Sequence, residues 1–244
     1  MSIFSLTCPD VGCYQNFLCD PEFQNKIVAV AYVRKSAALD AQEKSTADNW
    51  ISATKSTLSI YKIGLELFLN IGVDGASELV EKHGIELFLD LKFHDIPNTV
   101  AQAVDSVKSL NPKFLTVHAS GGTEMISAAA KSAGNTSITA VTILTSLSDK
   151  EVNEIGYAKG SLESAVNLAK LATSAGATSI VCSPFEASAI RQAVDHSVAL
   201  ITPGVRPIDS DSGDQKRFAT PSDAIKSFGS FICNSSQTSK RLAC

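Results

Sequence analysis

The sequence predicts an α/β fold of the (β/α)₈ barrel class, and three observations lead to this prediction. The chain has 244 residues, which is enough for one α/β barrel or for two small domains. After about residue 35, short apolar runs alternate with amphipathic segments. The short runs are apolar throughout, as parallel strands covered by helices are. Roughly seven or eight such units favour a barrel, with a doubly wound sheet as the alternative.

The individual elements follow from these patterns in chain order. The predicted strands cover residues 58–65, 85–91, 113–119, 137–144, 178–183 and 198–204. The predicted helices cover residues 47–58, 75–84, 99–110, 123–134 and 162–176. Several of these helical patterns end in Gly, as helices commonly do. Residues 230–233 suit a short eighth strand. No linker or internal repeat divides the chain, so residues 35–244 are expected to form one barrel domain.

The first strand has two competing registers. Residues 27–33 (IVAVAYV) have the better strand composition but end without an acidic residue. Residues 36–41 (SAALDA) supply Asp40 and leave room for a helix before Lys62. We favour the second register, which makes residues 1–34 an N-terminal extension without an assigned role.

Charge and cysteine usage exclude several classes of protein. The formal net charge is −4 and Lys and Arg are scattered, so nothing indicates a nucleic-acid or membrane surface. No apolar run is long enough to span a bilayer, and the amino-terminal residues do not resemble a secretory signal. The six cysteines match no zinc-binding spacing. We therefore expect a cytoplasmic protein with reduced thiols and no metal site, rather than a disulfide framework.

The candidate site residues are the polar residues at the carboxyl ends of the predicted strands, because both folds place their chemistry there. They are Lys62, the group from Asp90 to Asp95, His118, Thr145, Ser146, Ser183 and the segment 202–207.

The densest of these groups combines two carboxylates with two ammoniums. Asp90 and Lys92 are two residues apart on an extended segment, so their side chains should project to the same face. Lys62 should lie on the neighbouring strand, and Asp95 lies past the strand end before Pro97. Burying such a network costs several kcal/mol per ion, so it is a poor source of stability. A site is favoured, and a structural salt-bridge cluster is the alternative.

Residues 90–99, DLKFHDIPNT, resemble the signature of the orotidine 5'-monophosphate decarboxylase family. The resemblance spans about residues 36–226 in one collinear order and includes YKIGLELF (61–68), VHASGG (117–122), AVTILTSL (140–147), VCSPFEA (181–187) and TPGVRP with GDQKR (202–217). It implies a (β/α)₈ barrel, a homodimer with shared active sites and no cofactor. The implied reaction converts orotidine 5'-monophosphate to UMP and CO₂ in de novo pyrimidine biosynthesis.

The resemblance also implies residue roles. Lys92 would be the general acid that protonates C6, Asp90 would lie near the scissile carboxylate, and Lys62 and Asp95 would complete the charged row. Among the implied substrate-binding residues, Asp40 would bind the ribose, and Thr145 or Ser146 would meet the pyrimidine. Ile96 and Thr99 would come from the partner subunit together with Asp95. Arg206 and Gln215 would bind the phosphate, and Pro203 lies in the turn before Arg206. His94 should point away from the row on simple alternation, and we interpret it as structural.

The carboxyl-terminal region departs from the family pattern. The family continues into a strand ending in Gly-Arg, which binds phosphate, and then a final helix, whereas this chain ends in FGSFICNSSQTSKRLAC. We therefore expect a shortened C-terminus and weaker phosphate affinity. Two alternative functions remain open at this point: a metal-dependent phosphosugar lyase or aldolase on the same barrel, and a catalytically weak nucleotide-binding barrel.

Overall fold

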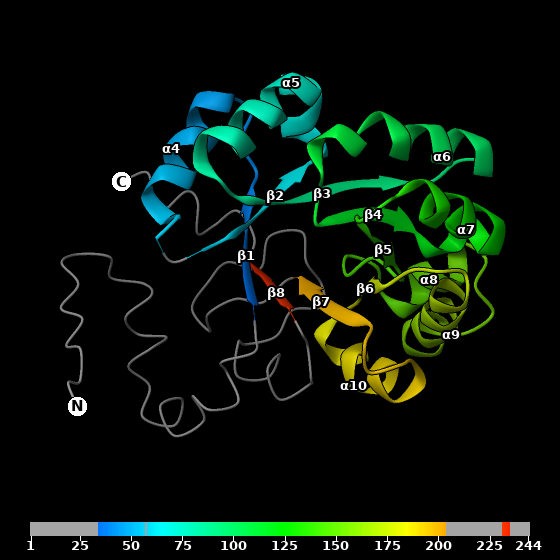
Figure 1. Cartoon of the computed structure of the whole chain (residues 1–244). Coiled ribbons are helices and arrows are strands. Elements are labelled where there is room, and N and C mark those ends of the chain that lie inside the picture. The colour runs from blue at the N-terminus through cyan, green and yellow to red at the C-terminus, as the bar shows by residue number, and fades with distance from the viewer. Residues whose placement is uncertain (1–33, 57, 204–230, 235–244) are drawn as a thin grey trace, which may run out of the picture. The chain divides into compact units, whose positions relative to one another are not determined.

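Eight parallel strands close into a barrel in the computed structural model of the chain (Figure 1). The structure describes residues 34–56, 58–203 and 231–234, and only the backbone of residues 34, 35 and 231–234. The strands are β1 (Arg34–Leu39), β2 (Ile60–Gly64), β3 (Glu86–Phe93), β4 (Phe114–His118), β5 (Ser137–Val141), β6 (Ser179–Val181), β7 (Ala199–Pro203) and β8 (Phe231–Asn234). Each strand pairs in parallel with its neighbours in chain order, and β8 pairs with β1. This arrangement confirms the predicted fold class.

Within the described ranges, helices follow strands β1 to β6 and lie outside the barrel (Figure 1). They are α4 (Lys44–Thr54), α5 (Leu65–His83), α6 (Pro97–Ser106), α7 (Gly122–Ser132), α8 (Asp149–Glu154), α9 (Ser161–Ser174) and α10 (Pro184–Ala193), with 3₁₀ turns η1 (Lys108–Leu110) and η2 (Ala119–Gly121). Within the described ranges, no helix is both long enough and apolar enough to cross a membrane.

The barrel closes through the two terminal strands. β1 pairs with β2 through Ser36 and Ile60, and with β8 through Arg34 and Phe231. This pairing places Asp40 directly after β1, as the favoured register predicted. The competing register at 27–33 lies outside the described residues, as do residues 1–33 of the predicted extension and the predicted shortened C-terminus after residue 234.

Three helices differ from the sequence-based expectation. α5 begins ten residues before the predicted 75–84 segment, directly after β2, and contains a break at Gly72 with φ 66°. Glycine adopts this left-handed conformation without a Cβ clash, so one helical segment follows another. α8 and α10 were not predicted, although each begins with a capping box, Ser148 with Glu151 and Ser183 with Glu186. The S-x-x-E spacing was the signal for both.

The core has two layers. A large cluster of aliphatic side chains fills the space between the strands and the helices. A smaller cluster, formed by Ile60, Phe88, Phe114 and Ile201, lies separately from it, with the rings of Phe88 and Phe114 edge to face at 5.6 Å. Ile60, Phe88 and Phe114 stand two positions before Lys62, Asp90 and Thr116, respectively. Because side chains alternate along a strand, each apolar residue faces the same side of its strand as the polar residue that follows it. The apolar layer therefore underlies the polar ends of the strands.

Candidate active site

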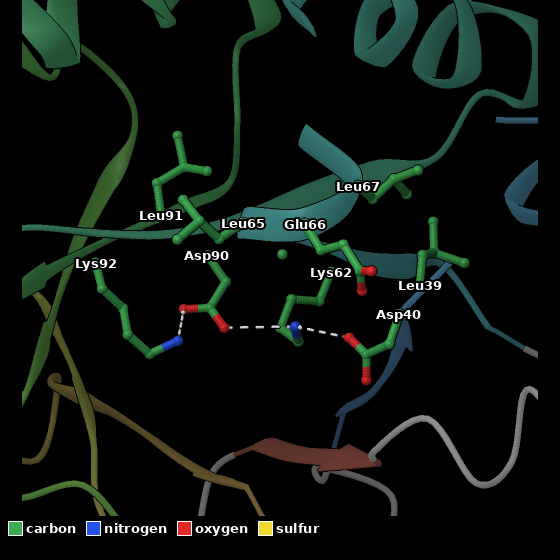
Figure 2. A pocket seen from close by; sticks show the side chains of 10 residues that line it. Leu39, Asp40, Lys62, Leu65, Glu66, Leu67, Asp90, Leu91 and Lys92 are labelled. Atoms are coloured by element: carbon green, nitrogen blue, oxygen red, sulfur yellow. Dashed lines mark hydrogen bonds and ion pairs between the residues drawn. The ribbon is translucent and has the colours of Figure 1, made fainter. Parts of the chain in front are cut away.

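Four charged side chains form a row of alternating sign at the carboxyl ends of β1, β2 and β3 (Figure 2). Lys62 Nζ lies 3.5 Å from Asp40 Oδ1 and 3.4 Å from Asp90 Oδ2. Lys92 Nζ lies 2.7 Å from Asp90 Oδ1. The order along the row is therefore Asp40, Lys62, Asp90, Lys92. The structure brings together three of the four predicted catalytic side chains and the predicted ribose ligand.

The row forms one wall of a pocket of about 220 Å³ at the barrel mouth. The remaining lining residues are mostly apolar and come from the ends of the same strands and the first turn of α5 (Figure 2). They are Leu39, Gly64, Leu65, Glu66, Leu67 and Leu91. A pocket with apolar walls and a few convergent charged groups is the usual form of a small-molecule site.

Asp90 is the electrostatic centre of the row. Burial raises its pKa, but the ammoniums of Lys62 and Lys92 and hydrogen bonds from Lys92 and Thr116 outweigh that effect. The pKa of Asp90 therefore lies below its usual range, and the carboxylate stays charged at neutral pH. A largely buried carboxylate held ionised beside two ammoniums is typical of functional sites.

The backbone of β3 is irregular where it carries these residues. Its register against β4 shifts between Leu89 and Phe93, so the segment from Asp90 to Lys92 bulges out of the ladder. Lys92 has φ 50°, a left-handed conformation that costs a non-glycine residue roughly 1–3 kcal/mol. The prediction that Asp90 and Lys92 share a face is consistent with their ion pair, but the extended backbone assumed for it is wrong at Lys92. A bulge, not simple alternation, brings the two side chains together.

Thr116 on β4 is a further residue at the row, which was not among those predicted from the sequence. Its side chain is fully buried, and its hydroxyl contacts both members of the Asp90–Lys92 pair. The backbone N–H of Lys92 donates to Thr116 Oγ1 at 2.8 Å, and that hydroxyl donates to Asp90 Oδ1 at 3.0 Å. A polar residue within the apolar run FLTVH was the available signal.

Two imidazoles lie beside the row. The rings of His94 and His118 are 5.4 Å apart at a tilt of 38°. Burial lowers the pKa of His118, and the charges of His94 and Lys92 lower it further, whereas Asp90 raises it. His118 is therefore neutral at pH 7. His94 is exposed and contacts the other imidazole, so its predicted structural role stays a prediction.

Gly64, the last residue of β2, has no side chain that would contact the Lys62 ammonium. A Cβ at this position would lie 3.1 Å from Lys62 Nζ and 3.8 Å from Asp40 Oδ1. Its backbone is extended, with φ −89°, so the constraint concerns contact and not backbone strain. A side chain here would press on the row.

Other predicted site residues lie outside this pocket. Asp95, Ile96 and Thr99 are exposed in the loop and first turn after β3, and Asp95 Oδ1 accepts the backbone N–H of Ile96 at 2.6 Å. Thr145 is buried and Ser146 half-buried in the loop after β5, and neither lines the pocket.

The remaining candidates divide into three cases. Ser183 is buried and caps α10, so helix capping accounts for it. Pro203 is the last residue of β7 and does not line the pocket. Arg206 and Gln215 lie outside the described residues. In the part of the chain that the structure describes, no three His, Cys, Asp or Glu side chains are grouped as metal ligands.

The chain is similar to several proteins that carry the same name. The chain is 46% identical over 190 residues to an orotidine 5'-phosphate decarboxylase of Thermobifida fusca, covering 78% of this chain and 82% of that protein. It is 46% identical over 193 residues to one of Idiomarina loihiensis, covering 78% and 83%. A crystal structure of orotidine 5'-phosphate decarboxylase from Lactobacillus acidophilus matches with a TM-score of 0.72 and 33% identity, over 84% of this chain and 90% of that one.

The match also holds at the level of the family. Residues 36–235 match the sequence model of the Orotidine 5'-phosphate decarboxylase / HUMPS family, and this range contains the whole charged row. The protein therefore belongs to the Orotidine 5'-phosphate decarboxylase / HUMPS family.

Proposed function

We propose that the chain decarboxylates orotidine 5'-monophosphate to UMP and CO₂ in pyrimidine biosynthesis. The observation that carries the proposal is the alternating row, in which Asp90 holds the Lys92 ammonium at 2.7 Å and stays ionised. The names of the relatives support the same activity. The reaction requires no cofactor in this proposal, because the row itself supplies the charges and the proton.

The proposed chemistry places Lys92 as the general acid. When the bond between C6 and the carboxylate breaks, its electron pair stays on C6 as a carbanion with little resonance stabilisation. A fixed ammonium beside C6 stabilises this charge without solvent reorganisation. Lys92 then transfers a proton from its ammonium to C6, becomes neutral, and is reprotonated from solvent. Asp90 lies against the departing carboxylate and favours its loss, while Lys62 keeps Asp90 charged.

Substrate binding is proposed to use residues around this row. Asp40 binds the ribose, Thr145 or Ser146 meets the pyrimidine, and Pro203, Arg206 and Gln215 lie at the phosphate. The phosphate contacts matter because binding energy from a remote group can position the reacting carbon.

A second copy of the chain is proposed to complete each site in a homodimer. Its Asp95 would extend the charged row, and its Ile96 and Thr99 would contact the substrate. Ile96 is 67% exposed and would therefore be accessible to a second copy. We also propose that the predicted extension is separate from the barrel, with Arg34 belonging to β1 instead, and that the protein is cytoplasmic.

The decisive experiment follows the absorbance of orotidine 5'-monophosphate with purified protein, with and without EDTA. Turnover that persists with the chelator supports the metal-free decarboxylase. Turnover that EDTA removes supports a metal-dependent enzyme of the same barrel. Folded protein that binds UMP in a titration but shows no turnover supports a nucleotide-binding barrel, and each of the last two results contradicts the proposal.

A further inference from the structure

We infer that Thr116 is a positioning residue for the Asp90–Lys92 pair: its hydroxyl holds the bulge of β3 that aims the Lys92 ammonium along the row. The inference rests on the proposed function, because the pair matters through the reaction that it performs. Thr116 is fully buried on β4, bonds to both members of the pair, and acts through these two residues.

The bulge creates the need for such a residue. In a regular parallel ladder a strand N–H donates to a carbonyl of the neighbouring strand. The register shift between Leu89 and Phe93 interrupts the ladder at Lys92, where the backbone is left-handed. The Lys92 N–H donates instead to the side chain of Thr116. A β4 residue with no side-chain acceptor would leave this N–H without that bond.

The directions of the hydrogen bonds follow from the groups involved. The Lys92 N–H can only donate, so Thr116 Oγ1 accepts from it at 2.8 Å. The Asp90 carboxylate, which is ionised, can only accept, so the hydroxyl hydrogen points to Asp90 Oδ1 at 3.0 Å. Asp90 Oδ1 in turn accepts from Lys92 Nζ at 2.7 Å.

These three contacts close a ring. It runs from the Lys92 backbone through the Thr116 hydroxyl and the Asp90 carboxylate to the Lys92 ammonium. One hydroxyl therefore positions the backbone of Lys92, the proposed acid, and also the carboxylate that pairs with the Lys92 ammonium. Because a donor and an acceptor are needed on the same atom, serine can replace threonine in this role, while valine and alanine cannot.

The chain offers a matched control on the neighbouring strand. Thr139 on β5 is the Cα partner of Thr116 and is equally buried. Its hydroxyl bonds to Ser179 Oγ at 2.6 Å and to the Ser137 carbonyl at 3.3 Å, and no contact with the Asp90–Lys92 pair is among its described hydrogen bonds. Thr139→Val therefore removes a buried threonine hydroxyl from the barrel without removing the proposed contact.

The experiment measures kcat and KM for orotidine 5'-monophosphate in the wild type, T116V, T116S, T116A and T139V. We expect T116V and T116A to lower kcat by roughly 10- to 100-fold, the range for losing one hydrogen bond to a charged group. KM should change much less, because the proposed phosphate contacts lie elsewhere. T116S should restore kcat to near the wild-type value, and T139V should resemble the wild type in kcat.

The T116S and T116A pair differs only in the hydroxyl and remains informative where T116V does not fold. Any of three results would overturn the inference. The first is a wild-type kcat in T116A, the second is an equal loss of kcat in T116S and T116A, and the third is an equal loss of kcat in T116V and T139V.

A second readout separates this inference from the proposed activity. Amide hydrogen exchange at Lys92, followed with ¹⁵N-lysine-labelled protein, should be faster in T116A than in T116S. If the wild type shows no turnover, the proposed function fails, and the exchange result alone decides whether Thr116 holds the bulge. Equal exchange rates in the two variants would contradict the inference.

Discussion

The Lys92 ammonium lies 2.7 Å from Asp90 Oδ1, and only Leu91 separates these two residues on the bulged segment of β3. A left-handed backbone at Lys92 accompanies this contact. Strain of this kind persists only where surrounding contacts hold it, and here Thr116 bonds both to the Lys92 backbone and to Asp90. Contacts within the protein therefore hold the pair in place.

Lys92→Ala should abolish turnover and leave the barrel folded, because this side chain is more than one-third exposed and is not part of the apolar core. Loss of a general acid lowers kcat by at least roughly 100-fold. The measurement is orotidine 5'-monophosphate turnover together with circular dichroism. Lys82→Ala, which removes a surface lysine paired with Asp48, is the control and should retain activity. An unfolded Lys92→Ala protein would instead support a structural salt-bridge cluster.

Asp90→Asn should lower the free energy of unfolding at pH 7 by roughly 1–3 kcal/mol, because two ammoniums lose a buried ionised partner. The pKa of Asp90 is lower in the folded chain than its reference of 3.8. Its stabilising contribution is therefore present above pH 3.8 and is lost as the pH falls through the folded pKa.

Urea unfolding at several pH values checks this prediction. The difference between wild type and Asp90→Asn should persist at about pH 5 and shrink only below 3.8. Asp105→Asn, which removes an exposed ion pair with Lys108, should have little effect at any pH. A difference that is absent at pH 7 would contradict the stabilising role of the charge.

His118 should titrate below 6.5, because burial and then the charges of His94 and Lys92 lower its pKa. NMR titration of its ring proton measures the midpoint. His94→Asn should raise this midpoint, and Asp90→Asn should lower it, because Asp90 raises the pKa of His118. The unfolded chain binds a proton at higher pH than the folded chain, so this group makes stability decline as the pH falls below 6.5. His196→Asn, in an exposed position before β7, should leave the midpoint unchanged.

Gly64→Ala should lower kcat/KM by about tenfold, because the added methyl group would lie 3.1 Å from Lys62 Nζ and displace the ammonium. Gly160→Ala is a matched control. Both glycines precede a helix with extended backbone, at φ −89° and −63°, but a Cβ at Gly160 meets only Asp149 at ordinary distances. Steady-state kinetics of both variants decide the matter, and equal kinetics would show that the row tolerates the displacement.

Mixing Lys92→Ala with Asp95→Ala protein should recover activity if a second copy supplies Asp95. In a mixed dimer one site then holds both intact residues, so random exchange restores at most roughly a quarter of the sites. Mixing Lys92→Ala with Asp90→Ala is the control and should recover nothing, because both residues belong to the row of one chain. No recovery in the first mixture would argue against shared sites.

The sequence by itself predicted the fold class and the four residues of the charged row. Continuous apolar runs followed by one-sided helical patterns predicted the parallel barrel, because parallel sheets are generally buried on both faces. The register that ends at Asp40 also followed from local sequence, as did the positions of Lys62, Asp90 and Lys92 at strand ends. These features depend on residues close together in the chain.

The tertiary structure alone decided how the charged groups are held. The bulge in β3 is a shift of its register against β4, and the Thr116 hydroxyl reaches Lys92 across 24 positions of sequence. The space for the Lys62 ammonium depends on the missing side chain of Gly64. Periodicity describes one segment at a time, whereas these contacts exist only after strand pairing has placed distant segments side by side. The residue types of the row therefore follow from local sequence, whereas its geometry depends on the pairing of neighbouring strands in the barrel.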